Sequence, residues 1–223
     1  MTEAEWLACR DPKPMLKFIG GQASDRKLRL FAVSVAHQAW PCLVEPDLRN
    51  ALDIAERGSD GAVPFEALHV ATKRVDDLLG TRAASAGYST PSEWFRTTSV
   101  ENRSIHFWVF LTVFPKSMNS LRNADSIVYS LASKITGSLQ PQLLREAFGN
   151  PFRSVLVDPA WLTSTVLGLA TGIYEEKSFD RMPILADALQ DAGCDSEEIL
   201  NHCRQPGEHV RGCWVIDTLL GKS

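Results

Sequence analysis

The sequence has no hydrophobic stretch long enough to cross a membrane. A membrane-spanning helix needs about 20 consecutive apolar residues, and the most apolar segment, 106–114, ends at Pro115 after about half that length. The N-terminal residues Met1, Thr2 and Glu3 begin an acidic segment that lacks the apolar core of a signal peptide. We therefore expect a soluble, cytoplasmic protein with no membrane partner.

The sequence is also poor in the features of disulfide frameworks and of nucleic-acid binders. Its five cysteines are an odd number and follow no secretion signal, which argues for reduced thiols. The 23 basic residues are outnumbered by 27 acidic ones, whereas a dedicated nucleic-acid binder usually carries a basic excess. The basic residues between Lys13 and Arg29 are therefore interpreted as a solvated helix face, and we expect no nucleic-acid partner.

The common catalytic and cofactor-binding motifs are absent. The chain contains no phosphate-binding glycine loop, no HExxH, no GxSxG and no EF-hand pattern. We therefore predict no catalytic residues and no cofactor. The lack of a motif does not exclude an enzyme, so the question stays open, with a preference for a protein that is not an enzyme.

What the sequence does contain is a series of helix-start signals. A short polar side chain can accept a hydrogen bond from a free N–H group of the first turn, and a proline placed there loses nothing because its missing N–H had no partner. Asp or Ser followed three residues later by Glu forms a capping box. The clearest starts are Asp11-Pro12, Pro64, Asp158-Pro159, Pro183 and Asp195 with Glu198.

Apolar residues between these starts recur at spacings of three and four, which is typical of amphipathic helices. The pattern is clearest over 121–135, and the aromatic run 106–114 is interpreted as a helix because its neighbours are helical. We predict an all-α fold, an irregular bundle or short solenoid-like stack of about ten short helices, with at most one isolated short strand at 153–157. The chain is predicted to be a single helical domain, 1–223, with a candidate boundary in the Ser- and Thr-rich loop 85–104.

The C-terminal third carries several distinctive segments. They include Leu185–Cys194 (LADALQDAGC), His202-Cys203-Arg204 and His209–Trp214 (HVRGCW). Together with Phe148–Arg153 (FGNPFR) they resemble an uncharacterised bacterial protein family that occurs in many copies in certain large genomes. The resemblance covers residues 1–60 and 143–222 and implies one coherent bacterial protein, but it implies no activity and supplies no catalytic residues.

The same third holds histidines and cysteines that could ligate zinc, which takes Cys sulfur and His nitrogen in a tetrahedron. The candidate ligands are Cys203, His209 and Cys213. His202 precedes Cys203, and adjacent side chains on a helix point about 100° apart, so both are not expected to reach one ion. We favour the alternative that the two cysteines are buried small apolar residues. A third interpretation is a thiolate nucleophile at Cys213, which begins a helix, although no oxyanion-hole motif accompanies it.

A polar group around the last loop is a candidate ligand or partner site. It comprises Arg204, His209, Arg211, Trp214 and Asp217. Arginine makes two-pronged bonds to carboxylate or phosphate, so the group could bind a small anion or a protein. The alternative is a cluster of salt bridges that fixes the loop, with Arg211 paired to Asp217 or Asp187.

On this evidence we favour a non-catalytic helical protein-interaction or regulatory module, with a protein partner or as a homo-oligomer. The prediction depends on the absence of a convincing site and on the many aromatic residues of the middle segment, which suit interface anchors as well as cores. The alternative is a small-ligand-binding or zinc-binding protein, or an enzyme, that uses the C-terminal His, Cys and Arg residues.

Overall fold

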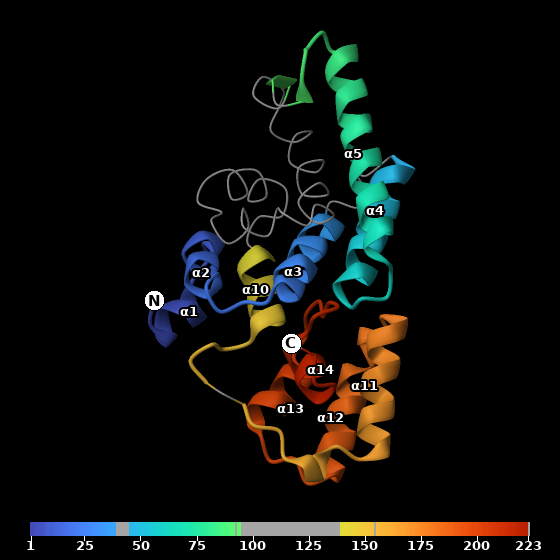
Figure 1. The fold of residues 1–223 in the computed structure, drawn as a ribbon. Helices are drawn as coiled ribbons and strands as arrows, with labels where there is room; N and C mark the ends of the chain where they lie inside the picture. The colour runs from blue at the N-terminus through green and yellow to red at the C-terminus, as the bar shows by residue number, and fades with distance from the viewer. Residues whose placement is uncertain (39–44, 92, 95–138, 154, 223) are drawn as a thin grey trace. The chain divides into compact units, whose positions relative to one another are not determined.

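The computed structural model describes residues 1–38, 45–91, 93–94, 139–153 and 155–222 (Figure 1). Within these ranges the chain forms ten α-helices and two short 3-10 helices, and no strand. The all-α prediction is therefore confirmed. Residues 153 and 155–157, where the isolated strand was expected, are not in a strand. No helix among the described residues is both long and apolar enough to span a membrane.

Several expectations lie outside the described residues. They are the aromatic helix at 106–114, the amphipathic helix at 121–135 and most of the candidate boundary at 85–104. The described contacts divide the chain into two compact units, Glu3–Leu144 and Arg145–Ser223, and the division falls within helix α10 (Leu139–Phe148). The prediction of a single domain stays a prediction.

The first unit contains five fully described helices. They are α1 (Glu3–Ala8), α2 (Pro12–Ile19), α3 (Asp25–Gln38), α4 (Pro46–Ser59) and α5 (Phe65–Ser85). Asp11 caps α2 as predicted, because its side chain accepts a hydrogen bond from the Lys13 N–H at 3.0 Å. Helix α4 packs against both α3 and α5. A partly buried ion pair between Arg26 and Asp60, at 2.8 Å, joins the first turn of α3 to the C-cap residue of α4.

The second unit, Arg145–Ser223, is built from the end of α10 and four further helices. These are α11 (Ser164–Glu176), α12 (Met182–Asp191), α13 (Glu197–Arg204) and α14 (Trp214–Leu219), with the 3-10 turns η3 (Pro159–Trp161) and η4 (Phe179–Arg181). Helix α12 packs between α11 and α13, and α14 contacts α11 and α13. The core between them is apolar and includes Val166, Ile173, Leu185, Leu189, Ile199 and Ile216.

Two of the predicted helix starts in this unit are displaced. Asp158 caps only the 3-10 turn η3, and α11 begins later because the Thr163 side chain accepts from the Val166 N–H. Ser196, not Asp195, caps α13 by accepting from the Ile199 N–H. Both differences have the same cause. The N-cap is the residue whose short side chain reaches a free N–H group of the first turn, and several nearby residues could do so.

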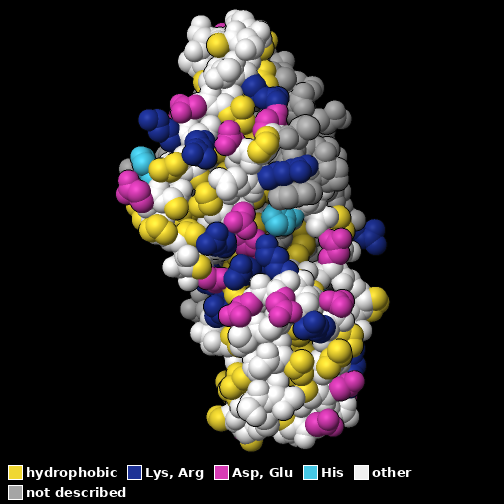
Figure 2. Space-filling view, turned by 90° about the vertical axis from the view of Figure 1, so that its right-hand side faces the viewer, with side chains coloured by type: hydrophobic (Ala, Val, Ile, Leu, Met, Phe, Trp, Pro, Cys, Tyr) yellow, Lys and Arg dark blue, Asp and Glu magenta, His cyan; other side chains and the backbone are white. Residues whose placement is uncertain are grey.

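Charged side chains of both signs are interspersed on the described part of the face in Figure 2. This distribution agrees with a sequence whose 23 basic and 27 acidic residues nearly balance.

Candidate metal centre

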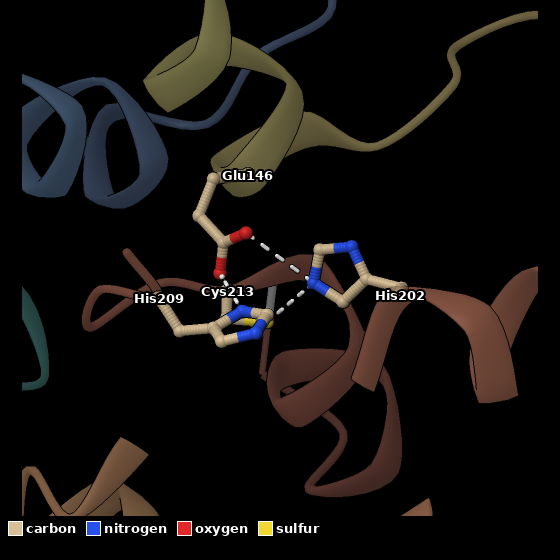
Figure 3. Close-up of side chains that lie close together, drawn as sticks. All are labelled: Glu146, His202, His209 and Cys213. Carbon is tan, nitrogen blue, oxygen red and sulfur yellow. Dashed lines mark hydrogen bonds and ion pairs between the residues drawn. The ribbon is translucent and has the colours of Figure 1, made fainter. Parts of the chain in front are cut away.

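Four side chains of the second unit converge on one point: Glu146, His202, His209 and Cys213 (Figure 3). Each offers one ligand atom, and these atoms all lie within 4.8 Å of one another. The site is buried, since the exposed fraction is 9% for the His202 side chain, 6% for Glu146 and His209, and 0% for Cys213. Among the described residues no other group of three or more His, Cys, Asp or Glu side chains converges in this way.

The four residues come from four different local structures. Glu146 lies near the end of α10, and His202 lies in the last turn of α13. His209 belongs to the loop that follows α13, and Cys213 occupies the N-cap position of α14. The loop turns sharply before Cys213, because the Cys213 N–H bonds to the Val210 carbonyl at 2.9 Å and Gly212 has a positive φ of 93°. The turn brings both ends of the loop to the same point.

The Glu146 carboxylate connects the two imidazole rings. His209 Nδ1 lies 2.9 Å from Glu146 Oε1, and His202 Nε2 lies 3.3 Å from Oε2. His202 Nε2 is also 3.1 Å from Cys213 Sγ. In a tetrahedral site with bonds near 2.0–2.3 Å, neighbouring ligand atoms are separated by about 3.3–3.8 Å. These three separations lie in this range or a few tenths of an ångström below it, and the four ligand atoms all lie within 4.8 Å of one another. The separation given for His209 is that of Nδ1.

One atom of the cluster has no partner. His209 Nε2 is buried and makes no hydrogen bond to any described residue. Buried polar atoms are hydrogen-bonded in the great majority of cases, so this nitrogen calls for a partner, such as a water molecule or an ion. Because His209 Nδ1 donates to Glu146, Nε2 of the neutral ring carries a lone pair, which is what a metal ion requires.

The charges of the site are set by burial and by the two rings. Burial alone would raise the pKa of Glu146, but the hydrogen bonds and the electrostatic attraction from His202 and His209 together outweigh it and lower this pKa to about 2. Burial raises the pKa of Cys213 well above its ordinary value, and the nearby Glu146 carboxylate raises it further. The site therefore holds a carboxylate and a protonated thiol, and a cation would have to replace the thiol proton.

The second ring nitrogen of His202, Nδ1, also has hydrogen-bonding neighbours. It accepts a hydrogen bond from the Trp214 indole N–H at 3.0 Å, and the Gln205 amide lies 3.2 Å from the same nitrogen. The Trp214 ring meets the His202 ring edge to face, with centroids 5.1 Å apart. These contacts fix the orientation of the His202 ring and therefore the direction in which Nε2 points.

Gly149 leaves the space that the Trp214 ring occupies. It follows α10 with a positive φ of 63°, and a Cβ there would lie only 3.0 Å from Trp214 Cγ. We expect Gly149→Ala to lower the free energy of unfolding by about 2 kcal/mol, from left-handed backbone strain and from displacement of the indole. Gly193→Ala is the matched control, because Gly193 has φ 88° but nothing within 4 Å of the Cβ position. Equal losses in urea titrations of the two variants would contradict the proposed contact with Trp214.

The sequence offered three candidate zinc ligands, although buried apolar cysteines were favoured over a metal site. Of these candidates His209 and Cys213 belong to the cluster, whereas Cys203 is not one of the four and packs in the apolar core with Ile199 and Leu200. His202, on the same helix turn as Cys203, is also a member. Only one of these two neighbours reaches the site, as the angle between them predicts.

Glu146 had no sequence signal that linked it to the histidines. It lies 63 positions before His209, in a helix whose other features are ordinary. In the sequence it stands three residues after Leu143 and next to Ala147, and charged residues are rarely buried among apolar ones unless they are paired.

The polar group predicted around the last loop is distributed among different partners. Arg204 Nη2 bonds to Asp187 Oδ1 at 2.8 Å and to the Gln190 amide oxygen at 2.7 Å, so Asp187 pairs with Arg204 and not, as expected, with Arg211. The Arg211 guanidinium lies 4.5 Å from the centre of the Tyr174 ring. Asp217 is buried, with 1% exposed. Of the five residues, His209 lies in the four-residue cluster and Trp214 contacts it.

Comparison with protein-family models gave no match, and comparisons with curated proteins and with solved structures gave no match either. The resemblance to an uncharacterised bacterial family stays a prediction from the sequence.

Proposed function

We propose that the second unit binds one divalent transition-metal ion, zinc or an ion of similar preference, through Glu146, His202, His209 and Cys213. The observation that carries the proposal is the convergence of these four buried ligand atoms within 4.8 Å. Two imidazole nitrogens, a thiolate and a carboxylate form a donor set that suits zinc and disfavours magnesium and calcium, which prefer oxygen alone.

The proposed role of the ion is structural. Four protein ligands fill a tetrahedral coordination shell, whereas catalytic zinc sites keep one position for water or substrate. The ion would join the end of α10, the last turn of α13, the following loop and the start of α14, which contribute one ligand each. Metal binding is coupled to folding in such a site, because the ligands converge only in the folded chain. A structural ion is compatible with the predicted non-catalytic interaction module, whose partner stays a prediction.

Titration of the full chain with Co²⁺ tests the proposal. Tetrahedral Co²⁺ bound by a thiolate gives intense visible bands and a sulfur-to-metal charge-transfer band. We expect both to saturate at one equivalent, and we expect His209→Ala to abolish them because it removes a ligand whose Nε2 has no other partner.

The controls are chosen from the same residue types outside the site. Cys9→Ser changes a half-buried thiol whose Sγ bonds to the Asp11 carbonyl, and His69→Ala changes an exposed ring on α5. Both variants should bind Co²⁺ as the unaltered protein does. Circular dichroism and thermal unfolding show whether His209→Ala remains folded. A folded His209→Ala variant with an unchanged Co²⁺ spectrum would overturn the proposal.

A further inference from the structure

His202 Nδ1 has two neighbours of different hydrogen-bonding character. The Trp214 indole N–H can only donate, and it lies 3.0 Å from Nδ1. The Gln205 amide nitrogen lies 3.2 Å from the same nitrogen and can donate to it, and a turn of the amide would present its oxygen, which can only accept. We propose that these two residues control metal binding in opposite directions, Trp214 by opposing it and Gln205 by favouring it, through the position of the His202 proton. This inference rests on the proposed function.

A neutral imidazole carries a single ring proton, on one of its two nitrogens. Because Trp214 donates to Nδ1, that nitrogen must present its lone pair, and the ring proton must lie on Nε2. There it faces Glu146 Oε2 at 3.3 Å and Cys213 Sγ at 3.1 Å. In this arrangement Nε2 is a hydrogen-bond donor and has no lone pair for a metal ion.

Metal binding through Nε2 requires the other tautomer. The proton must move to Nδ1, where it would face the Trp214 N–H at the observed 3.0 Å. Two donors directed at each other repel, so the indole must withdraw or the coordination is weakened. The tautomer change releases no proton. The proton lost when the ion binds is that of the Cys213 thiol, whose sulfur forms the bond to the metal.

Gln205 supplies the partner that this second tautomer needs. Its side chain lies at the end of α13 and the residue is exposed, so the amide can turn and present its oxygen to the Nδ1–H. Ligating histidines usually donate their second N–H to an oxygen in this way, and loss of that partner typically weakens metal binding 10- to 100-fold. Trp214 and Gln205 therefore act as positioning residues that hold opposite tautomers of one ligand.

The test compares Co²⁺ affinities in competition with a chelator. Trp214→Phe keeps an aromatic ring against Gly149 but removes the N–H, and we expect it to bind Co²⁺ about tenfold more tightly than the unaltered protein. Gln205→Leu should bind about tenfold more weakly, because no oxygen remains for the Nδ1–H. Trp161→Phe, which changes a half-buried tryptophan of the same unit, is the control and should leave the affinity unchanged. If Trp214→Phe acted only by loosening the packing, its affinity for Co²⁺ would fall. A rise in affinity therefore distinguishes removal of the indole N–H from loss of packing.

Nitrogen-15 NMR of His202 gives an independent result. In the unaltered protein freed of metal by a chelator, we expect the His202 proton on Nε2. In the same protein loaded with Zn²⁺, we expect it on Nδ1. If the unaltered protein binds one equivalent but Trp214→Phe binds equally or more weakly, the inference fails and the proposed function stands. A His202 proton on Nδ1 in the chelator-treated protein would also overturn the inference and leave the proposed function standing. If the unaltered protein binds no Co²⁺, both fail.

Discussion

Cys213→Ser is expected to lower the affinity for Co²⁺ at least about a hundredfold and to remove the sulfur-to-metal charge-transfer band. A serine hydroxyl stays protonated at neutral pH and is a poor ligand, whereas a thiol gives up its proton to a metal ion even when burial raises its pKa, as it does for Cys213. Chelator competition gives the affinity, and absorbance of the Co²⁺ form shows whether sulfur is bound. Without metal, the free energy of unfolding should fall less than in the corresponding variant of Cys203, because the hydroxyl keeps His202 Nε2 as a hydrogen-bond partner.

Cys203→Ser is the matched variant. Cys203 precedes the loop as Cys213 follows it, and both thiols are buried, with 1% and 0% of each residue exposed. Because Cys203 packs in the apolar core and is not one of the four converging residues, its replacement should keep the charge-transfer band. It should lower the free energy of unfolding by about 1–3 kcal/mol, the usual cost of burying a poorly paired hydroxyl. Loss of the band in Cys203→Ser and its retention in Cys213→Ser would make Cys203 the sulfur ligand and would contradict the proposed site.

The sequence predicted the helical architecture because helix starts are local. Asp11 caps α2 and a glycine, Gly193, follows α12, as expected from their types and neighbours. Errors arose where two caps competed, as between Asp195 and Ser196. Choosing between them requires the backbone angles of both residues, and these depend on how α13 packs against α12.

The site was only partly predictable, for a different reason. His209 and Cys213 lie four residues apart, so their proximity could be read from spacing, and the divergence of His202 and Cys203 follows from helix geometry. Which of these two neighbours faces inward to the core and which faces the cluster depends on where α10 ends. Glu146 and the role of Trp214 could not be predicted, because they depend on contacts between helices that are distant in the chain.

The metal-free protein is expected to lose stability in acid through Glu146. Its pKa in the folded protein is about 2, lowered from 4.5, so its contribution is complete above pH 4.5 and is lost as the pH falls through 2. A shift of this size corresponds to a contribution on the order of 3 kcal/mol to the free energy of unfolding. The groups that face the carboxylate are His202, His209, Cys203 and Cys213. Urea unfolding between pH 7 and pH 2, with a chelator present, measures the effect.

The variant Glu146→Gln isolates this carboxylate from all other acidic groups. Its stability at neutral pH should fall toward that of the unaltered protein in acid, because the amide carries no charge for the two rings to bind and one of its two polar atoms cannot accept from them. Its stability should then change less between pH 4.5 and pH 2 than that of the unaltered protein. Glu197→Gln, at an exposed position in the first turn of α13, should follow the unaltered protein closely. If the free energy of unfolding of Glu146→Gln and of the unaltered protein changed with pH in parallel, the carboxylate would not be stabilised by the histidines. That result would contradict the arrangement of Glu146, His202 and His209 on which the proposed metal site depends.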